Sequence, residues 1–177
     1  MDKLKECFNN AMKDEDKGKK HKGLLFTQPD SKKAEDYIKK AKKNLEICEI
    51  YKQMRLDYKI PEEWFYTLYY CALTILSKFG VESRSQRCTA LFLKYLKDKN
   101  LIEYDEEFID RITVYSDKEE KSDVDQREEA RYGSSVKSEE ILHKYSPMMN
   151  ICKKAIDQAE EITCSQKQYK IPKELTE

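Results

Sequence analysis

Four arginines lie in two short clusters, and they are the residues of this sequence best suited to binding an anion. Arg84 and Arg87 belong to the segment GVESRSQRC, and Arg127 and Arg131 belong to REEARYG. A guanidinium stays charged at any working pH and binds phosphate or carboxylate through paired N–H groups. Carboxylates are abundant near these arginines, so an ordinary salt bridge is the alternative interpretation for each one.

No histidine accompanies these arginines. The chain contains only His21 and His143, and neither lies within seven residues after an arginine. Histidine is the side chain whose ordinary pKa lies near neutrality, so we expect anion binding without general acid–base catalysis. The sequence also lacks a glycine-rich phosphate loop, a cluster of metal ligands and a nucleophile motif. Neither a metal nor a cofactor is expected.

The six cysteines include no CxxC pair, and several lie at apolar helical positions. This pattern is typical of buried free thiols in a reducing cytosol. The N-terminal segment has no apolar stretch of signal-peptide length, and no segment is apolar enough to span a bilayer. A cytoplasmic protein without a membrane partner is therefore expected.

Among the elements that must hold these residues, the most apolar is the stretch of residues 61–80. Eleven of the thirteen residues from Trp64 to Leu76 are apolar or aromatic. A stretch that is hydrophobic on every side belongs at the centre of a domain. Pro61 suits a first helical turn and Gly80 suits a C-terminal cap, so a central helix is predicted over residues 61–79.

The rest of the chain also has a helical pattern, with only four glycines and four prolines in 177 residues. Apolar residues at three- and four-residue spacing predict helices over residues 32–56, after a cap at Ser31, and 85–98. A fourth helix is predicted from Asp105 to near Gly133, with a highly charged second half. A fifth is predicted from Ser138 to about Cys164, with a kink or a restart at Pro147.

Both ends of the chain differ from this helical region. Residues 1–30 are predicted to be an extension with a short amphipathic helix, on which Leu4, Phe8 and Met12 share one face. Residues 13–22 follow as a charged run that fits either a flexible linker or a phosphate-binding patch. Residues 165–177 are predicted to be a loose polar tail.

Charge is balanced overall but unevenly distributed. The chain has 34 basic and 34 acidic residues, yet residues 1–43 carry a net charge of +5 and residues 103–140 a net charge of −8. A molecule with oppositely charged regions can pair with itself or with a polarised partner.

The order of these segments resembles the HEPN domain family. The resemblance rests on YYCALTILSKFG in the central helix, followed by GVESRSQRC and an acidic helix ending in REEARYG, and it covers about residues 31–164. It implies an all-α, up-and-down bundle of four to five helices, commonly a homodimer and often encoded beside a minimal nucleotidyltransferase. Many members are metal-independent ribonucleases of toxin–antitoxin systems that use an arginine and, four to six residues later, a histidine.

The sequence departs from that catalytic pattern. Arg127 matches the arginine of the family motif, but Tyr132 stands where nuclease members carry histidine. A tyrosine that titrates near 10 is a poor general base at neutral pH. Core packing at the end of a helix is the alternative role for Tyr132.

Two functions remain open from the sequence. The first is a non-catalytic module that binds a nucleotide, an RNA or a partner protein, within a toxin–antitoxin-like or nucleotidyltransferase-associated system. Its expected binding residues are Arg84, Arg87, Arg127 and Arg131. The second is a metal-independent endoribonuclease toxin that uses Arg127 with Tyr132 or another substituted acid or base.

Overall fold

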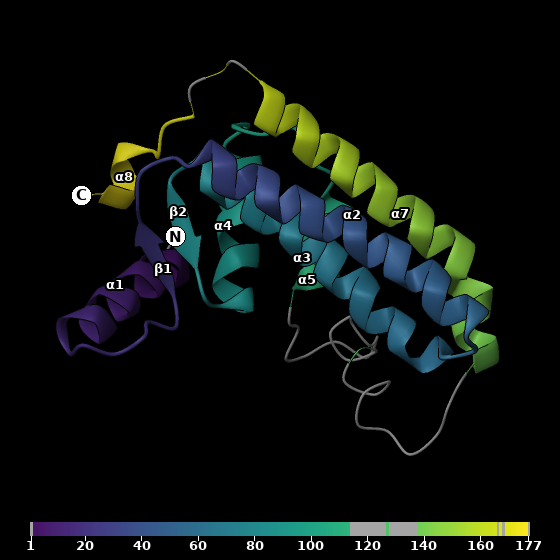
Figure 1. Cartoon of the computed structure of the whole chain (residues 1–177). Helices are drawn as coiled ribbons and strands as arrows, with labels where there is room; N and C mark the ends of the chain where they lie inside the picture. The colour runs from purple at the N-terminus through teal and green to yellow at the C-terminus, as the bar shows by residue number, and fades with distance from the viewer. Residues whose placement is uncertain (1, 114–126, 128–137, 166, 168, 177) are drawn as a thin grey trace.

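The computed structural model describes residues 2–113, 127, 138–165, 167 and 169–176 (Figure 1). The described chain is predominantly helical with very little sheet, which confirms the predicted all-α class. In chain order the elements are α1 (Asp2–Asp16), β1 (Leu24–Phe26), α2 (Ser31–Gln53), the 3-10 turn η1 (Asp57–Lys59), α3 (Ile60–Lys78), β2 (Val81–Ser83), α4 (Gln86–Asp98), α5 (Glu106–Ile112), α7 (Ser138–Cys164) and α8 (Lys173–Thr176).

Helix α3 forms the centre of the core, as the apolar stretch predicts. Trp64, Leu68 and Leu76 are buried, and so are most of their neighbours on this helix. The helix ends where Gly80 takes a φ of 68°. A Cβ at this position would lie only 2.5 Å from the carbonyl oxygen of Thr27, so glycine is needed here for both conformation and space.

Two long helices pack along α3. Helix α2 runs antiparallel to it, as two contacts show. The hydroxyl of Thr67 approaches the carbonyl of Ala41, and further along α3 the hydroxyl of Thr74 donates to the carbonyl of Ala34, earlier in α2. Helix α7 lies beside both, and the thiol of Cys152 lies 3.7 Å from the carbonyl oxygen of Trp64. Figure 1 shows α2, α3 and α7 side by side, with α4 and α5 behind α3.

Three predicted helix boundaries need correction. The N-cap of α2 is Asp30, whose carboxylate accepts a hydrogen bond of 2.8 Å from the Lys33 amide. The helix that begins after Asp105 ends at Ile112 because the next residue is extended; the predicted remainder lies outside the described residues, apart from Arg127. Helix α7 is continuous across Pro147, so no restart occurs there.

Both ends of the chain dock on the helical core. Helix α1 buries Leu4 and Phe8, although Met12 is exposed. Strand β1 pairs antiparallel with β2, with Leu25 opposite Glu82. At the other end, α8 buries Leu175. The prediction of a loose tail is therefore wrong for this residue, which packs against the core.

The expectation of six free thiols is also wrong. Cys7 of α1 and Cys88 of α4 form a disulfide across a sequence separation of 81 residues. The remaining four cysteines form no disulfide in the structure, and all but Cys164 are buried. Among the helices that the structure describes, none combines the length and apolar composition that crossing a bilayer requires.

Candidate functional site

Arg127 packs against the central helix. Its guanidinium carbon lies 4.5 Å from the centre of the Phe65 ring and 5.9 Å from that of the Tyr66 ring. A cation over an aromatic face is attracted by the negative charge density of the ring. The contact places the guanidinium beside α3.

The rings under Arg127 belong to a continuous aromatic cluster. Phe65 stacks on Tyr69 with ring centres 5.9 Å apart, and Tyr66 lies 6.0 Å from Tyr70. Tyr70 in turn stacks on Tyr37 of α2 at 6.0 Å with an interplanar angle of 19°. We call these five residues the tyrosine face. Phe65 is buried, whereas the four tyrosines are half-buried.

Helical periodicity explains why these rings gather on one side of α3. Trp64 faces α7, where its ring lies 6.0 Å from Tyr145. Successive helical residues are rotated by about 100°, so Tyr66 and Tyr70 lie roughly 200–240° away from Trp64 around the helix. The two tyrosines therefore point away from α7, and Tyr37 reaches them from the neighbouring helix.

A second cation lies at the other end of the face. The ammonium of Lys40 is 5.5 Å from the centre of the Tyr37 ring and 5.6 Å from that of Tyr70. Lys40 is exposed, so its charge remains available to an anion in solvent. Half-exposed rings between two cations can hold a flat aromatic group while its phosphate meets a positive charge.

Two tyrosines of the face and one neighbouring carboxylate are shifted toward their neutral forms. Burial raises the pKa of Tyr69 and of Tyr70, and the phenol of Tyr66 and the carboxylate of Glu63 raise the latter further. Burial, followed by the nearby carboxylate of Glu62, also raises the pKa of Glu63. Tyr69 and Tyr70 therefore act as neutral rings and hydroxyl donors at neutral pH.

The tyrosine face also reaches the segment that carries the first arginine cluster. The hydroxyl of Tyr69 hydrogen-bonds with Ser83 and Thr89, which lie on either side of the turn between β2 and α4. Within this turn Arg84 is exposed and forms a 3.1 Å ion pair with Glu82. Arg87 is exposed in the first turn of α4.

The structure thus connects two of the sequence-predicted sites. Arg127 contacts Phe65, Phe65 stacks on Tyr69, and Tyr69 bonds to the segment around Arg84 and Arg87. Arg131 and Tyr132, the other two candidate residues, lie outside the described residues. The salt-bridge alternative holds for Arg84, whose guanidinium is paired with Glu82.

Sequence reasoning did not identify Tyr37, Tyr66 and Tyr70 as site residues. A signal was present, because tyrosines occur twelve times in this chain and two of them are four residues apart on α3. The pairing of Tyr37 with Tyr70 joins residues on different helices, however, so it depends on the packing of α2 against α3.

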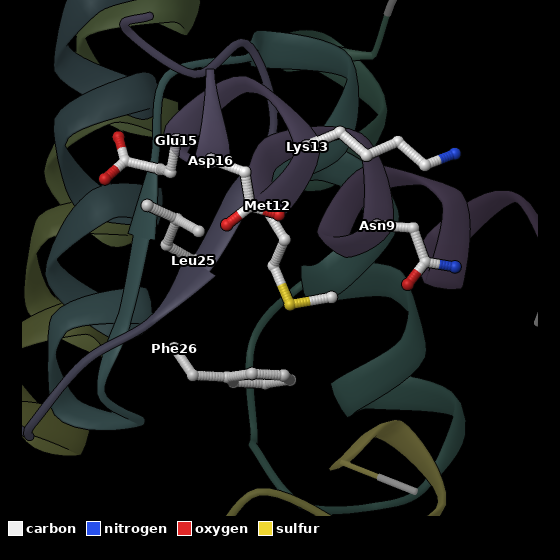
Figure 2. Close-up of a pocket in the computed structure, with 7 residues that line it drawn as sticks. All are labelled: Asn9, Met12, Lys13, Glu15, Asp16, Leu25 and Phe26. Carbon is white, nitrogen blue, oxygen red and sulfur yellow. The ribbon is translucent and has the colours of Figure 1, made fainter. Parts of the chain in front are cut away.

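A groove of about 590 Å³ lies between α1 and β1 (Figure 2). The side chains of Met12 and Phe26 face each other across it. Its other lining residues are Asn9, Lys13, Glu15, Asp16 and Leu25. It contains no histidine or cysteine, and the described residues hold no group of three side chains suited to a metal.

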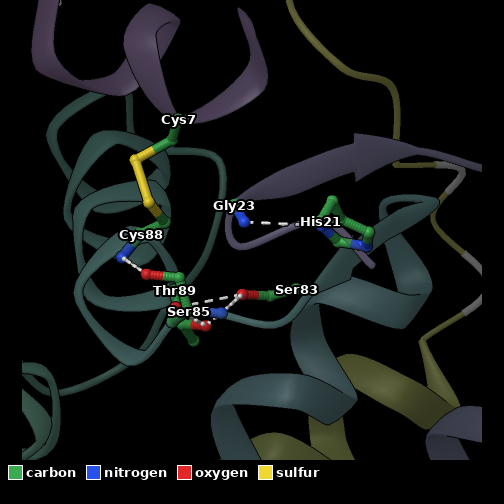
Figure 3. The surroundings of a disulfide bond; sticks show 7 residues. All are labelled: Cys7, His21, Gly23, Ser83, Ser85, Cys88 and Thr89. Carbon is green, nitrogen blue, oxygen red and sulfur yellow. Dashed lines mark hydrogen bonds between the residues drawn. A yellow bond between two sulfur atoms is a disulfide. The ribbon is translucent and has the colours of Figure 1, made fainter. Parts of the chain in front are cut away.

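The disulfide that anchors α1 lies beside the start of α4 (Figure 3). The amide of Cys88 donates to the hydroxyl of Ser85, the N-cap of α4. The hydroxyl of Thr89 donates to Ser83 at 2.7 Å. The disulfide and these bonds fix the turn that contacts Tyr69.

Comparisons of this chain with models of known protein families and with curated proteins found no match.

Proposed function

We propose that this chain is a HEPN-like, non-catalytic module that binds single-stranded RNA or a nucleotide on the tyrosine face. The observation that carries the proposal is the row of half-exposed tyrosines between Arg127 and Lys40. Proteins that bind single strands without reading sequence combine aromatic platforms for bases with cations for the backbone. The resemblance to the HEPN family supports the same class of ligand.

The chemistry of the face favours binding over cleavage. Burial raises the pKa of Tyr69 and of Tyr70, so their basic phenolate forms are scarce at neutral pH. Neither histidine takes part in the contacts of Arg127, Lys40 and the tyrosine rings described above. An arginine and a lysine can hold a phosphate without exchanging a proton.

A homodimer and a minimal nucleotidyltransferase partner complete the proposal. The nucleotidyltransferase rests on the family resemblance, whereas the homodimer is also supported by exposed apolar side chains where α2 meets η1. The partner protein would be recognised by co-purification, and the dimer by its mass in solution.

Fluorescence anisotropy with a labelled single-stranded RNA tests the binding. We expect binding that weakens strongly between about 50 mM and about 200 mM salt, because displaced counterions contribute to affinity. Tyr70→Leu removes one platform, which typically costs about 1–3 kcal/mol per stacked base, and Arg127→Ala removes a cation. Lys153→Ala on the exposed side of α7 is the matched control and should bind as the parent does.

Three outcomes would reject this function. The first is an absence of RNA and nucleotide binding at low salt. The second is parental affinity in both Tyr70→Leu and Arg127→Ala. The third is cleavage of the RNA without added metal that Arg127→Ala abolishes, because this result identifies the endoribonuclease instead.

A further inference from the structure

A short lysine-rich loop follows α1. Residues 17–22, here called the lysine loop, carry four exposed lysines and no acidic residue. A flexible linker was one of the two interpretations of this segment. The structure instead ties the loop to Asp14, whose carbonyl accepts from the Lys19 amide at 2.9 Å and whose carboxylate accepts from the Lys22 amide at 3.2 Å.

His21 anchors the loop from within. Its side chain is only 2% exposed, and its Nδ1 accepts a hydrogen bond from the Gly23 amide at 3.4 Å (Figure 3). Gly23 packs so closely on α1 that an added Cβ would collide with the carbonyl oxygen of Cys7. Cys7 is in turn bonded to Cys88 of α4. The four lysines are therefore presented from a fixed base, which reduces the ordering that binding must impose.

Glu82 joins the lysine loop to the start of α2. Its carboxylate lies 3.5 Å from Nε2 of His21, 3.2 Å from the ammonium of Lys33 and 3.1 Å from the guanidinium of Arg84. The loop, the first turn of α2 and the end of β2 thus meet at one carboxylate. The positive groups around Glu82 outnumber this single negative charge.

Lys33 connects this junction to the tyrosine face. Lys33, Tyr37 and Lys40 are spaced at i, i+4 and i+7 on α2, so they lie within about 60° of one another around the helix. The helix rises about 10 Å from Lys33 to Lys40. Tyr37 stacks on Tyr70, and Lys40 lies over both rings. Cations therefore continue from the tyrosine face to the lysine loop on one side of α2.

We infer that the lysine loop and Lys33 form a second contact surface for the backbone of a single-stranded RNA held by the tyrosine face. The strand then runs from the tyrosine face along α2 to the loop. This inference rests on the proposed function and adds the path of the ligand beyond it. A membrane surface or an acidic protein would also attract lysines, but neither needs the stacked rings that adjoin this path.

The double variant Lys19→Ala/Lys20→Ala tests the path with two labelled RNAs, one of about 4 and one of about 16 nucleotides. The short RNA can occupy the tyrosine face alone, so its affinity should be unchanged. The long RNA should bind more weakly. Because each neutralised phosphate of a single strand contributes about 0.7 to the salt dependence, the slope of log K against log salt should fall by about 1.4.

The control is Lys153→Ala/Lys154→Ala, which removes the same charge from the exposed side of α7. It should bind both RNAs as the parent does, and thermal melting should show that both double variants are folded. The inference is overturned if the loop variant binds the long RNA as tightly as the parent does. It is also overturned if the α7 variant lowers the affinity for the long RNA as much as the loop variant does. A loop variant that loses affinity for the short and the long RNA to the same degree would overturn it too.

Failure of the proposed function gives a different result. In one case, binding of the long RNA requires the lysine loop, but Tyr70→Leu changes the affinity for neither the short nor the long RNA. The loop is then a binding site and the tyrosine face is not. If Tyr70→Leu weakens both RNAs while the loop variant changes neither, the tyrosine face binds RNA and the path along α2 is wrong.

Discussion

Glu63 is a carboxylate whose protonation depends on folding. It lies half-buried in the first turn of α3, and burial, then Glu62, raises its pKa while Lys59 opposes this shift. At low pH the carboxyl is protonated in both the folded and the unfolded chain. As the pH rises past the ordinary value of 4.5, the unfolded chain ionises first and stability is lost until the folded carboxyl also ionises.

Replacement of Glu63 by glutamine should therefore stabilise the protein at neutral pH. We expect the urea midpoint of Glu63→Gln to exceed that of the parent at pH 7 and the difference to vanish below about pH 4. The helix dipole favours a carboxylate in the first turn and reduces the gain. Glu35→Gln, at an exposed position of α2, is the control. A Gln variant that is less stable at pH 7 would show that the charge makes a net favourable contact.

Tyr104 is a buried residue with a hydroxyl that has no hydrogen-bond partner among the described residues. The side chain is 2% exposed, and burial raises its pKa well above the ordinary value. A buried polar group without a partner costs about 1–3 kcal/mol. Tyr104→Phe should therefore be as stable as the parent or more stable, by up to about that amount, in urea unfolding. A loss of stability would reveal a buried water bonded to the hydroxyl.

At this scale the sequence identified Arg127 but not its surroundings. The segment REEARYG singled it out, because it resembles the arginine motif of the HEPN family. The rings that receive it come from α3, and Tyr37 comes from α2. Such neighbours follow from helix packing, which single-residue patterns do not encode.

At the scale of elements, α3 determines most of the core. Leu73 is 8% exposed on this helix. Leu73→Ala should lower the free energy of unfolding by roughly 2–5 kcal/mol, because lost transfer energy and a residual cavity add together. Leu142→Ala is the control, since Leu142 is 42% exposed on α7 and exposed substitutions usually change stability by less than about 0.5 kcal/mol. Equal stability of Leu73→Ala and the parent would contradict the central position of α3.

Long helices could be predicted because their signals are local. The expected central helix over 61–79 agrees with Ile60–Lys78, and the helix over 85–98 agrees with Gln86–Asp98. Strands β1 and β2 could not be predicted in the same way. Each has three residues, and they pair across more than fifty positions of the chain. The N-cap of α2 was predicted one residue too late, at Ser31, because Asp30 and Ser31 are both good N-cap residues.

The disulfide is the largest feature of the whole molecule that the sequence did not predict. Cys7 and Cys88 are 81 residues apart, and they meet only because α1 docks against α4. Spacing alone carries no signal for such a pair. The same docking turns the N-terminal extension into part of the core, with Leu4, Phe8 and Leu24 buried.

Reduction of this disulfide should destabilise the protein. Closing a long loop restricts the unfolded chain, and a typical disulfide contributes about 2–4 kcal/mol. The urea midpoint should fall with dithiothreitol and in Cys7→Ser, whereas Cys164→Ser should behave as the parent does, because Cys164 is exposed and free. Alkylation of the denatured, unreduced protein should label four cysteines. Labelling of all six would contradict the disulfide.

The last prediction is that the protein is a homodimer. Three large apolar side chains are exposed where α2 meets η1, namely Ile50 at 49%, Met54 at 63% and Tyr58 at 38%. Exposed apolar side chains that cluster in this way are typical of an interaction surface. The opposite net charges of residues 1–43 and 103–140 contribute only modestly, because physiological salt screens charges beyond about 8 Å.

Light scattering at micromolar concentration should therefore give a mass near twice the 21.1 kDa of one chain. Met54→Lys places a charge in the exposed apolar cluster and should shift the mass toward one chain, because burying an unpaired ammonium between subunits is unfavourable. A parental mass of 21.1 kDa would contradict the dimer. A dimer that Met54→Lys leaves intact would instead place the interface on another surface. The tyrosine face would be the first surface to test, because bound RNA and a second subunit would then compete for the same rings.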